Sequence, residues 1–482
     1  MSRIPVLSAP FFAAIALVAA GCGSTGGSAS GSSDGASIAP AGAPVYVSVD
    51  TNRASGQWKA AAALLAKFPG KQALLDRIDT SFSKSTGGLT FGKDVLPYLG
   101  PELDLVVLDV ADAGKNVVAM TQPTDAAKLD KALEAGTSPA VHTTVDGWTI
   151  FSDNQAALDR FKADAAKGKL ADGQQYQDAV AKLSGDSLAT LYLDGAAVKD
   201  YAQAHAGSIG GTGASAASDL RAVVAELVAG DTGVKLDGTA LFSKEQTSFR
   251  SFTSALAGDV PSGALAYLSF DNLAATLGQL RGAAGAQKQT GALGALGPTL
   301  TTIGALLGGE GALYVRTGSP VPEVTLVLTE ADPQQALAKL DELAHQLGAL
   351  VGAKVDDTTA AGVPVKRFAI RGFPIYYGLL DGKLVVTDTS GGFQGLKSGG
   401  AKLVDDQIFK DAKQAAGMGD RTTGFVYVDF RDSLPLLENF ASLAGTKLPA
   451  NLDANLQPLE SLLLFGSQQG KEASFTAYLS IR

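Results

Sequence analysis

Cysteine and histidine are scarce in this sequence. Cys22 is the only cysteine among 482 residues, so one chain cannot form an internal disulfide or a cysteine-based zinc site. The three histidines, His142, His205 and His345, lie far apart and match no spacing of metal ligands. We therefore expect no metal site and no cofactor, and a fold stabilised by buried apolar cores.

Long apolar runs and excess positive charge are also missing. Beyond the N-terminal region, no stretch reaches the roughly 18 consecutive apolar residues that indicate a membrane-spanning helix. The chain has 39 basic and 48 acidic residues and a pI near 5.0, which is unfavourable for binding nucleic acid. A hydrophobic content of 46% nevertheless predicts folded cores.

The N-terminal region has the three parts of a secretory signal. Arg3 supplies positive charge, residues 11–20 are an uninterrupted apolar run, and small residues precede Cys22. This order is typical of a bacterial lipoprotein signal, in which the cysteine thiol receives a diacylglycerol and becomes the first residue after cleavage. We predict a signal peptide over residues 1–21, lipidation at Cys22, and a lipid anchor at the extracytoplasmic face of the cell membrane. The alternative is an ordinary signal that leaves Cys22 as an incidental thiol.

A segment of small residues follows. Residues 23–43 are almost entirely Gly, Ser, Ala and Thr, and Asp34 is their only charge. Such a segment buries too little apolar surface to order itself. We expect the lipidated cysteine and a flexible linker to occupy residues 22–43.

The remaining sequence contains an internal repeat. Six residues recur 221 positions further on, and Tyr192 and Asp194 match Tyr427 and Asp429 at an offset of 235. Residues 251–253 match 474–476, and a Gly/Ala/Ser stretch at 207–218 accounts for the change in offset. We predict two tandem copies of a roughly 220-residue unit, over residues 44–260 and 261–482. The six repeated residues are Pro40, Gly42, Ala43, Tyr46, Ser48 and Asp50, which match Pro261, Gly263, Ala264, Tyr267, Ser269 and Asp271.

Within each copy, short apolar strands cluster and helices fall between the clusters. This favours an α+β fold with mainly antiparallel sheets flanked by helices. Helices are expected at 125–134 and 333–347, and a closing hairpin is expected at 233–243 with 247–256 and at 461–467 with 473–481. The other expected strands are 45–49, 103–110, 117–121, 148–152 and 188–193, then 264–270, 311–316, 323–329, 384–387 and 423–430.

Aspartates recur where strands give way to predicted helices. A carboxylate there can accept hydrogen bonds from the first free N–H groups of the helix, so helix capping explains both position and recurrence. A cation site is the alternative. These residues are Asp50, Asp153, Asp194, Asp271, Asp388 and Asp429.

One set of motifs resembles the serine penicillin-binding enzymes. Residues 81–84 fit S-x-x-K, residues 152–154 fit S-D-N, and residues 397–399 resemble K-T-G. The resemblance would make Ser81 the nucleophile and Lys84 its base. The third element lies in the other copy, however, and reads as the end of a helix. We therefore assign no catalytic residue.

Apolar helices suggest another alternative. Residues 60–66 and 293–307 are rich in Ala, Leu and Gly with few charges. Packing against the sheets is the simpler interpretation. Lining a cleft for a lipid or another hydrophobic ligand is the other.

The order of elements resembles a known family. The opening Pro/Gly-Ala-x-x-Tyr-x-Ser-x-Asp and the junction at residues 121–125 are similar to exported bacterial proteins that carry only a domain-of-unknown-function label. The resemblance would cover nearly all of residues 44–482. It implies placement in the cell envelope and assigns no functional residue.

We therefore expect a lipid-anchored cell-envelope protein of the non-enzymatic binding or interaction type. Its expected partners are the membrane, through the anchor, and a hydrophobic ligand or an envelope protein. A carrier of a hydrophobic ligand is the second hypothesis, and a serine–lysine hydrolase is the third.

Overall fold

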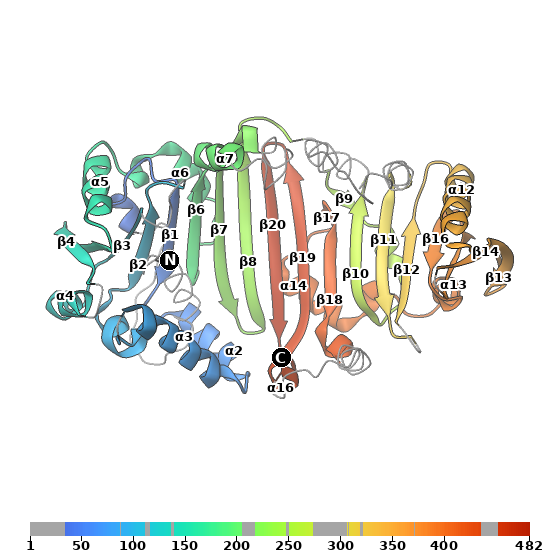
Figure 1. Cartoon of the computed structure of the whole chain (residues 1–482), viewed down its shortest axis with the longest axis horizontal. Coiled ribbons are helices and arrows are strands. Elements are labelled where there is room, and N and C mark those ends of the chain that lie inside the picture. The colour runs from blue at the N-terminus through green and yellow to red at the C-terminus, as the bar shows by residue number, and fades with distance from the viewer. Residues whose placement is uncertain are drawn as a thin grey trace. The chain divides into compact units, whose positions relative to one another are not determined.

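The fold is a mixed α+β structure that consists of two compact units (Figure 1). Among the described residues, the first unit runs to Glu245 and includes Ile481–Arg482, and the second covers Gln246–Ser480. The sheet of each unit is antiparallel, so the predicted α+β class is confirmed. This computed structural model describes residues 34–86, 88–110, 116–135, 139–204, 217–246, 250–272, 306, 308–318, 322–370, 372–434 and 452–482.

The sheet of the first unit has the spatial order β4-β5-β3-β2-β1-β6-β7-β8. The turn between β4 and β5 has positive φ at Asp146 and Gly147, the pattern of a tight two-residue hairpin. The strands are β1 (Val45–Asp50), β2 (Glu102–Val107), β3 (Val117–Thr121), β4 (Val141–Val145), β5 (Trp148–Ser152), β6 (Ala189–Asp194), β7 (Leu220–Gly230) and β8 (Gly233–Phe242).

Capping residues fix where several helices of this unit begin. Asp125 accepts a hydrogen bond from the Lys128 N–H at the start of α4, and Ser55 accepts one from the Trp58 N–H at the start of α2. The helical segments are η2 (Asp34–Ser37), α2 (Gly56–Ala66), α3 (Lys71–Thr86), η3 (Phe91–Val95), η4 (Leu96–Tyr98), α4 (Ala126–Glu134), α5 (Gln155–Ala165), η5 (Leu170–Asp172), α6 (Gln174–Val180), α7 (Gly195–Ala204) and η6 (Ala217–Asp219).

Both faces of the first sheet are buried at β2, β3 and β5. On one face, Tyr46 lies opposite Tyr192 across β1 and β6, and both rings contact Tyr176 of α6 edge to face. On the other face, Leu105 and Ala119 are almost fully buried. Strands that are apolar on both faces explain the near-continuous hydrophobic runs in the sequence.

The second sheet has the order β13-β14-β15-β16-β12-β11-β10-β18-β19-β20, with β9 and β17 paired separately. Here Tyr267 lies opposite Tyr427, as Tyr46 lies opposite Tyr192 in the first unit. The strands are β9 (Phe252–Thr253), β10 (Ala264–Asp271), β11 (Glu310–Arg316), β12 (Glu323–Leu328), β13 (Asp356–Ala360), β14 (Val363–Ile370), β15 (Phe373–Leu380), β16 (Lys383–Thr387), β17 (Arg421–Thr422), β18 (Phe425–Asp429), β19 (Leu459–Gln469) and β20 (Glu472–Ile481).

The longest described helix of the second unit is α12, and clear signals bound it. Asp332 accepts a hydrogen bond from the Gln335 N–H, Pro333 occupies the first turn, and Gly352 ends the helix with φ of 71°. The helix packs on β14, β15 and β16. The helical segments are η7 (Leu256–Gly258), α12 (Pro333–Val351), α13 (Gly391–Lys397), η8 (Leu403–Asp405), α14 (Gln407–Ala416) and α16 (Leu452–Leu456).

Three expectations need correction. The hairpin partner of β8 is β7, whereas Phe252–Thr253 pairs with Arg421–Thr422 in the second unit, so the predicted pairing of residues 247–256 is wrong. The sequence did not predict β7 because this strand is rich in alanine, which is uncommon in strands. Here the strand forms because its side chains are buried by packing in the sheet. We also missed the meander of β13, β14 and β15, where prolines and glycines interrupt the strand pattern.

The third correction concerns boundaries. Residues 34–43, expected in the linker, belong to the first unit, and Ala36 and Ala39 are fully buried. The units divide at Glu245 and Gln246, not at residues 260 and 261. The predicted signal peptide, Cys22 and most of the linker lie outside the described residues.

Candidate functional site

The point where the N-terminal segment joins the first unit is the best-defined polar site in that unit. The N–H groups of Asp34 and Gly35, which begin η2, each donate to the Glu102 carboxylate at 3.3 Å. The segment is fixed further by a bridge between Pro40 and Lys169. Glu102 at the start of β2 thus holds the first described turn of the chain against the sheet.

A second carboxyl group lies directly beneath this turn. Asp104 is fully buried on β2, and burial raises the pKa of its carboxyl well above the usual range. The charge of Glu102 and a hydrogen bond with it raise this pKa further, while hydrogen bonds from Ser48 and Tyr46 lower it. The folded state therefore favours the protonated form of the Asp104 carboxyl more than the unfolded state does.

Gly35 makes this arrangement possible. A Cβ atom at residue 35 would overlap the Asp104 carboxyl and press on the end of the Met120 side chain. The glycine therefore serves close packing, and the turn rests directly on the buried acid.

Asp50, at the end of β1, extends the acidic region because it lies opposite Glu102 of β2. Burial raises the pKa of the Asp50 carboxyl, and the charges of Asp186 and Glu102 add to the effect. Its Oδ1 accepts a hydrogen bond from the Asn52 N–H at 2.8 Å. Within the described ranges, no group of three or more His, Cys, Asp or Glu residues is placed to hold a metal ion. The site can hold a proton, and its charge therefore depends on pH.

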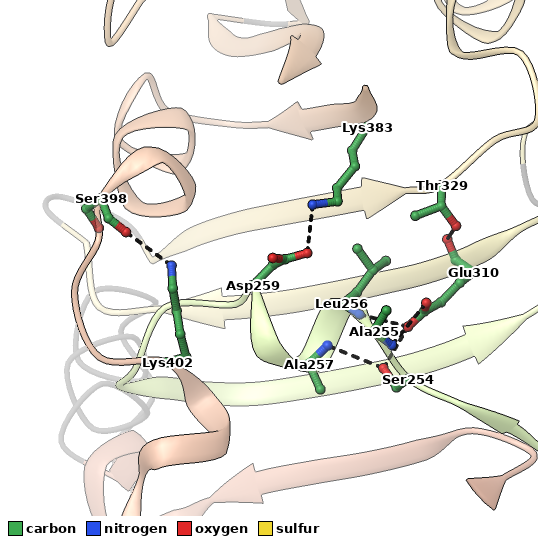
Figure 2. A network of polar contacts seen from close by, with 10 residues as sticks. All are labelled: Ser254, Ala255, Leu256, Ala257, Asp259, Glu310, Thr329, Lys383, Ser398 and Lys402. Atoms are coloured by element: carbon green, nitrogen blue, oxygen red, sulfur yellow. Dashed lines mark hydrogen bonds and ion pairs between the residues drawn. The ribbon is translucent and has the colours of Figure 1, made fainter. Parts of the chain in front are cut away.

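The second unit holds its first turn in the same way, as Figure 2 shows. The Glu310 carboxylate on β11 accepts from the Ser254 hydroxyl at 2.7 Å, the Leu256 N–H at 3.0 Å and the Ala255 N–H at 3.2 Å. Two residues along β11, at the place where β2 has Asp104, the strand has the fully buried Ala312. The capping carboxylate is present in both units, whereas at the position of the buried acid Asp104 the second unit has Ala312.

Sequence reasoning missed Glu102 and Asp104. The signal that could have found them is the charged residue between Leu103 and Leu105 in the middle of an apolar strand. A buried acid in that setting needs a specific partner.

The six recurring aspartates have mixed roles. Asp194 and Asp429 act as predicted, accepting from the Ala197 and Asp432 N–H groups at helix starts. Asp50 instead closes a turn with Asn52, as described above, and Asp388 accepts from the Val324 N–H across strands. At Asp153 the capping prediction is wrong.

The residue that caps α5 is the neighbour of Asp153. Asn154 accepts a hydrogen bond from the Ala156 N–H at 2.9 Å at the start of this helix. The segment expected to form a helix after Asp271 lies outside the described residues, so capping by Asp271 stays a prediction.

The serine–lysine motifs occupy structural positions. Ser81 and Lys84 lie on the exposed side of α3 and line a shallow surface hollow of about 350 Å³. Ser152 is fully buried, and its hydroxyl donates to the Val117 carbonyl at 2.8 Å.

The third motif begins at the end of a helix, as expected. Lys397 is the last residue of α13, and its ammonium group donates to the Ala361 carbonyl at 3.0 Å. Hydrogen bonds to the backbone therefore engage the side chains of Ser152, Asn154 and Lys397.

The histidines and apolar helices also have structural surroundings. His142 pairs with Asp130 at 3.5 Å, and His345 contacts the Asp341 carbonyl at 2.8 Å. In α2, Trp58, Ala61 and Leu64 are buried, so residues 60–66 pack into the unit. His205 and most of residues 293–307 lie outside the described residues. Among the described helices, none is both long enough and apolar enough to cross a membrane.

Comparisons with known proteins support the expected membership in a family of unknown function, but not the export that the resemblance implied. Comparison with curated proteins finds no match. The solved structure described as "Structure of crystal form IV of TP0453" is similar over 45% of this chain and 76% of that chain, with 14% identity and a TM-score of 0.26. A score this low does not establish a shared fold. The profile of the family described as "Protein of unknown function (DUF3352)" matches residues 127–478, most of the sequence, and the chain therefore belongs to that family.

Proposed function

We propose that the protein is a lipid-anchored, non-enzymatic binding protein at the extracytoplasmic face of the cell membrane. The observation that carries the proposal is the short distance in sequence between Cys22 and the turn held by Glu102. Residues 23–33, which are all Gly, Ser, Thr or Ala, separate Cys22 from Asp34. A Gly/Ser chain of eleven residues has a root-mean-square reach of about 18 Å. The folded body would then stay close to the lipid headgroups.

The attachment of η2 supports this placement physically. A tether restrains a folded body only if it is fixed to that body. Here the N–H groups of Asp34 and Gly35 donate hydrogen bonds to Glu102. The burial of Ala36 and Ala39 adds apolar contact to the polar one. The tether would therefore be joined to the body at a defined point, at Asp34.

We also infer that the body arose by duplication of one α+β unit. Equivalent features occur in the same order in the two units, at offsets between 208 and 235. Glu102 and Glu310 cap the first turn, and tyrosines face each other across the central strands. The bridges of Pro40 to Lys169 and Pro261 to Lys402 add a further equivalence. Two similar units on one anchor would favour an interaction role over a single catalytic site.

Cys22→Ser tests the anchor. The variant should lose the acyl label when cells are fed radiolabelled palmitate, and it should leave the membrane fraction. Ser24→Ala, two residues away, should keep both properties. An acyl label that persists in Cys22→Ser would contradict lipidation at this residue.

Native mass spectrometry of the purified protein separates the binding role from a carrier role. We expect the mass of the chain and its acyl group alone. Additional lipid in a fixed ratio would favour the carrier and count against a pure interaction protein.

A further inference from the structure

β4 lies at one end of the strand order of the first sheet. It pairs with β5 through Val141↔Ser152 to Val145↔Trp148, and no other described strand pairs with it (Figure 1). The backbone groups on its outer side therefore have no partner strand in the described part of this chain. A row of such groups is a template for a further strand.

Both faces of β4 make contacts within the unit, so the outer side is the open one. Val141 and Val145 pack against the apolar core that includes α5. On the other face, His142 pairs with Asp130 of α4 at 3.5 Å. Any macromolecule that adds to β4 must do so along the backbone edge.

The sequence of β4 lacks the charged residues and proline that often protect an edge against strand addition. β4 reads Val-His-Thr-Thr-Val and has no Asp, Glu, Lys, Arg or Pro. The outermost strand of the second unit, β13, begins instead with Asp356 and Asp357, and the Asp357 side chain is 89% exposed. Charged side chains of this kind discourage edge-to-edge pairing.

The geometry points to antiparallel pairing of β4 with β4 of a second copy of this chain, centred on Thr143. In that register Thr143 lies opposite itself, His142 opposite Thr144, and Val141 opposite Val145. Each pair is uncharged or can form a hydrogen bond, and β-branched residues lie opposite one another. The strand is complementary to itself, which an isologous twofold contact requires. If the chain is also anchored as proposed, confinement to a membrane would raise the effective concentration of copies.

Disulfide trapping tests the pairing and its register. The experiment uses the full-length chain with Cys22→Ser, in detergent, so that an introduced cysteine is the only thiol. Directly opposed residues of an antiparallel pair have Cα atoms about 4.5–5.5 Å apart, within the range of a disulfide. Copper phenanthroline and oxygen would oxidise the two thiols to one disulfide.

Thr143→Cys should give at least tenfold more covalent dimer than Thr359→Cys, the matched substitution on β13. A mixture of Val141→Cys and Val145→Cys chains should form the mixed dimer, whereas each variant alone should not. Circular dichroism of each variant confirms that both units are folded. Equal trapping at residues 143 and 359, or trapping of Val141→Cys with itself, would overturn the proposal. Absence of covalent dimer in the purified protein would also overturn it, and would leave the anchor proposal unaffected.

Discussion

The first turns of the two units are held by carboxylates in corresponding places. One turn packs on a buried polar side chain, and the other packs on an apolar one. In the first unit, Gly35 lies over the buried carboxyl of Asp104. In the second unit, the corresponding residues are Leu256 and Ala312, both fully buried in one apolar cluster. The first unit therefore places a small residue over a polar one, whereas the second unit places a large residue over a small one.

The two turns therefore have different structural roles. In the second unit the turn lies inside the chain and contributes apolar burial, which is insensitive to pH. In the first unit it is the end of the segment that leads back to Cys22, and its contact includes a carboxyl group that prefers to be protonated. The attachment of the N-terminal segment should therefore respond to pH through Asp104, a group for which the corresponding turn of the second unit has Ala312.

Gly35→Leu should be the most damaging change. The added side chain would overlap the Asp104 carboxyl, and we expect the free energy of unfolding of the first unit to fall by about 3 kcal/mol. Adding Asp104→Ala recreates the Leu–Ala pair of the second unit and should restore at least half of the loss. Urea unfolding followed by tryptophan fluorescence measures the first unit alone, because Trp58 and Trp148 are the only tryptophans.

Gly42→Leu provides the matched control. A Cβ atom there would meet nothing within 4 Å, so the free energy of unfolding should change by less than about 0.5 kcal/mol. Equal effects of Gly35→Leu and Gly42→Leu, or no rescue by Asp104→Ala, would refute the proposed fit between Gly35 and Asp104.

Asp104→Asn should change the pH dependence of the first unit. Since the pKa of Asp104 is raised on folding, the folded state binds the proton more tightly than the unfolded state. Its contribution to stability is therefore largest at low pH and falls as pH rises from the ordinary value near 4 through the raised pKa. Each pKa unit of elevation corresponds to about 1.4 kcal/mol.

The measurement is the tryptophan-detected free energy of unfolding between pH 5 and pH 8. The wild type should lose stability as pH rises across this range, because the unfolded chain has already released the proton that the folded chain still holds. We expect the curve of Asp104→Asn to be flatter, and that of Glu102→Gln to lie between the two, because Glu102 raises the pKa of Asp104. Parallel curves for wild type and Asp104→Asn would rule out Asp104 as the titrating group.

Sequence patterns predicted the parts of the fold that depend on local periodicity. The strands at residues 117–121 and 148–152 and the start of α12 at Pro333 match the structure to the residue. The failures involve long-range packing. The alanines of β7 favour a helix locally and form a strand because neighbouring strands bury them.

The candidate site was harder to predict than the fold. The attachment of residues 34–43 depends on Glu102, which is distant in sequence, and a Gly/Ala/Ser segment gives no local sign of burial. The capping aspartates show that even contacts between residues close in sequence are hard to predict. The strand-to-helix junction indicated that a cap is needed, but it did not identify which of two adjacent polar residues supplies it.

Asn154→Ala gives the smallest expected effect and tests that point. Loss of the Asn154 bond to the Ala156 N–H should destabilise α5 by about 1 kcal/mol. In the second unit, Ser390 precedes α13 with a helical backbone and no side-chain capping bond, so Ser390→Ala should have almost no effect. Hydrogen exchange of the α5 and α13 amides measures both helices in one experiment. Asp153→Ala is the local control and should leave exchange in α5 unchanged, because Asp153 does not supply the cap. If Asp153→Ala accelerated exchange in α5 as much as Asn154→Ala does, Asp153 would contribute to the cap. The two units would then be more alike at this junction than the hydrogen bonds indicate.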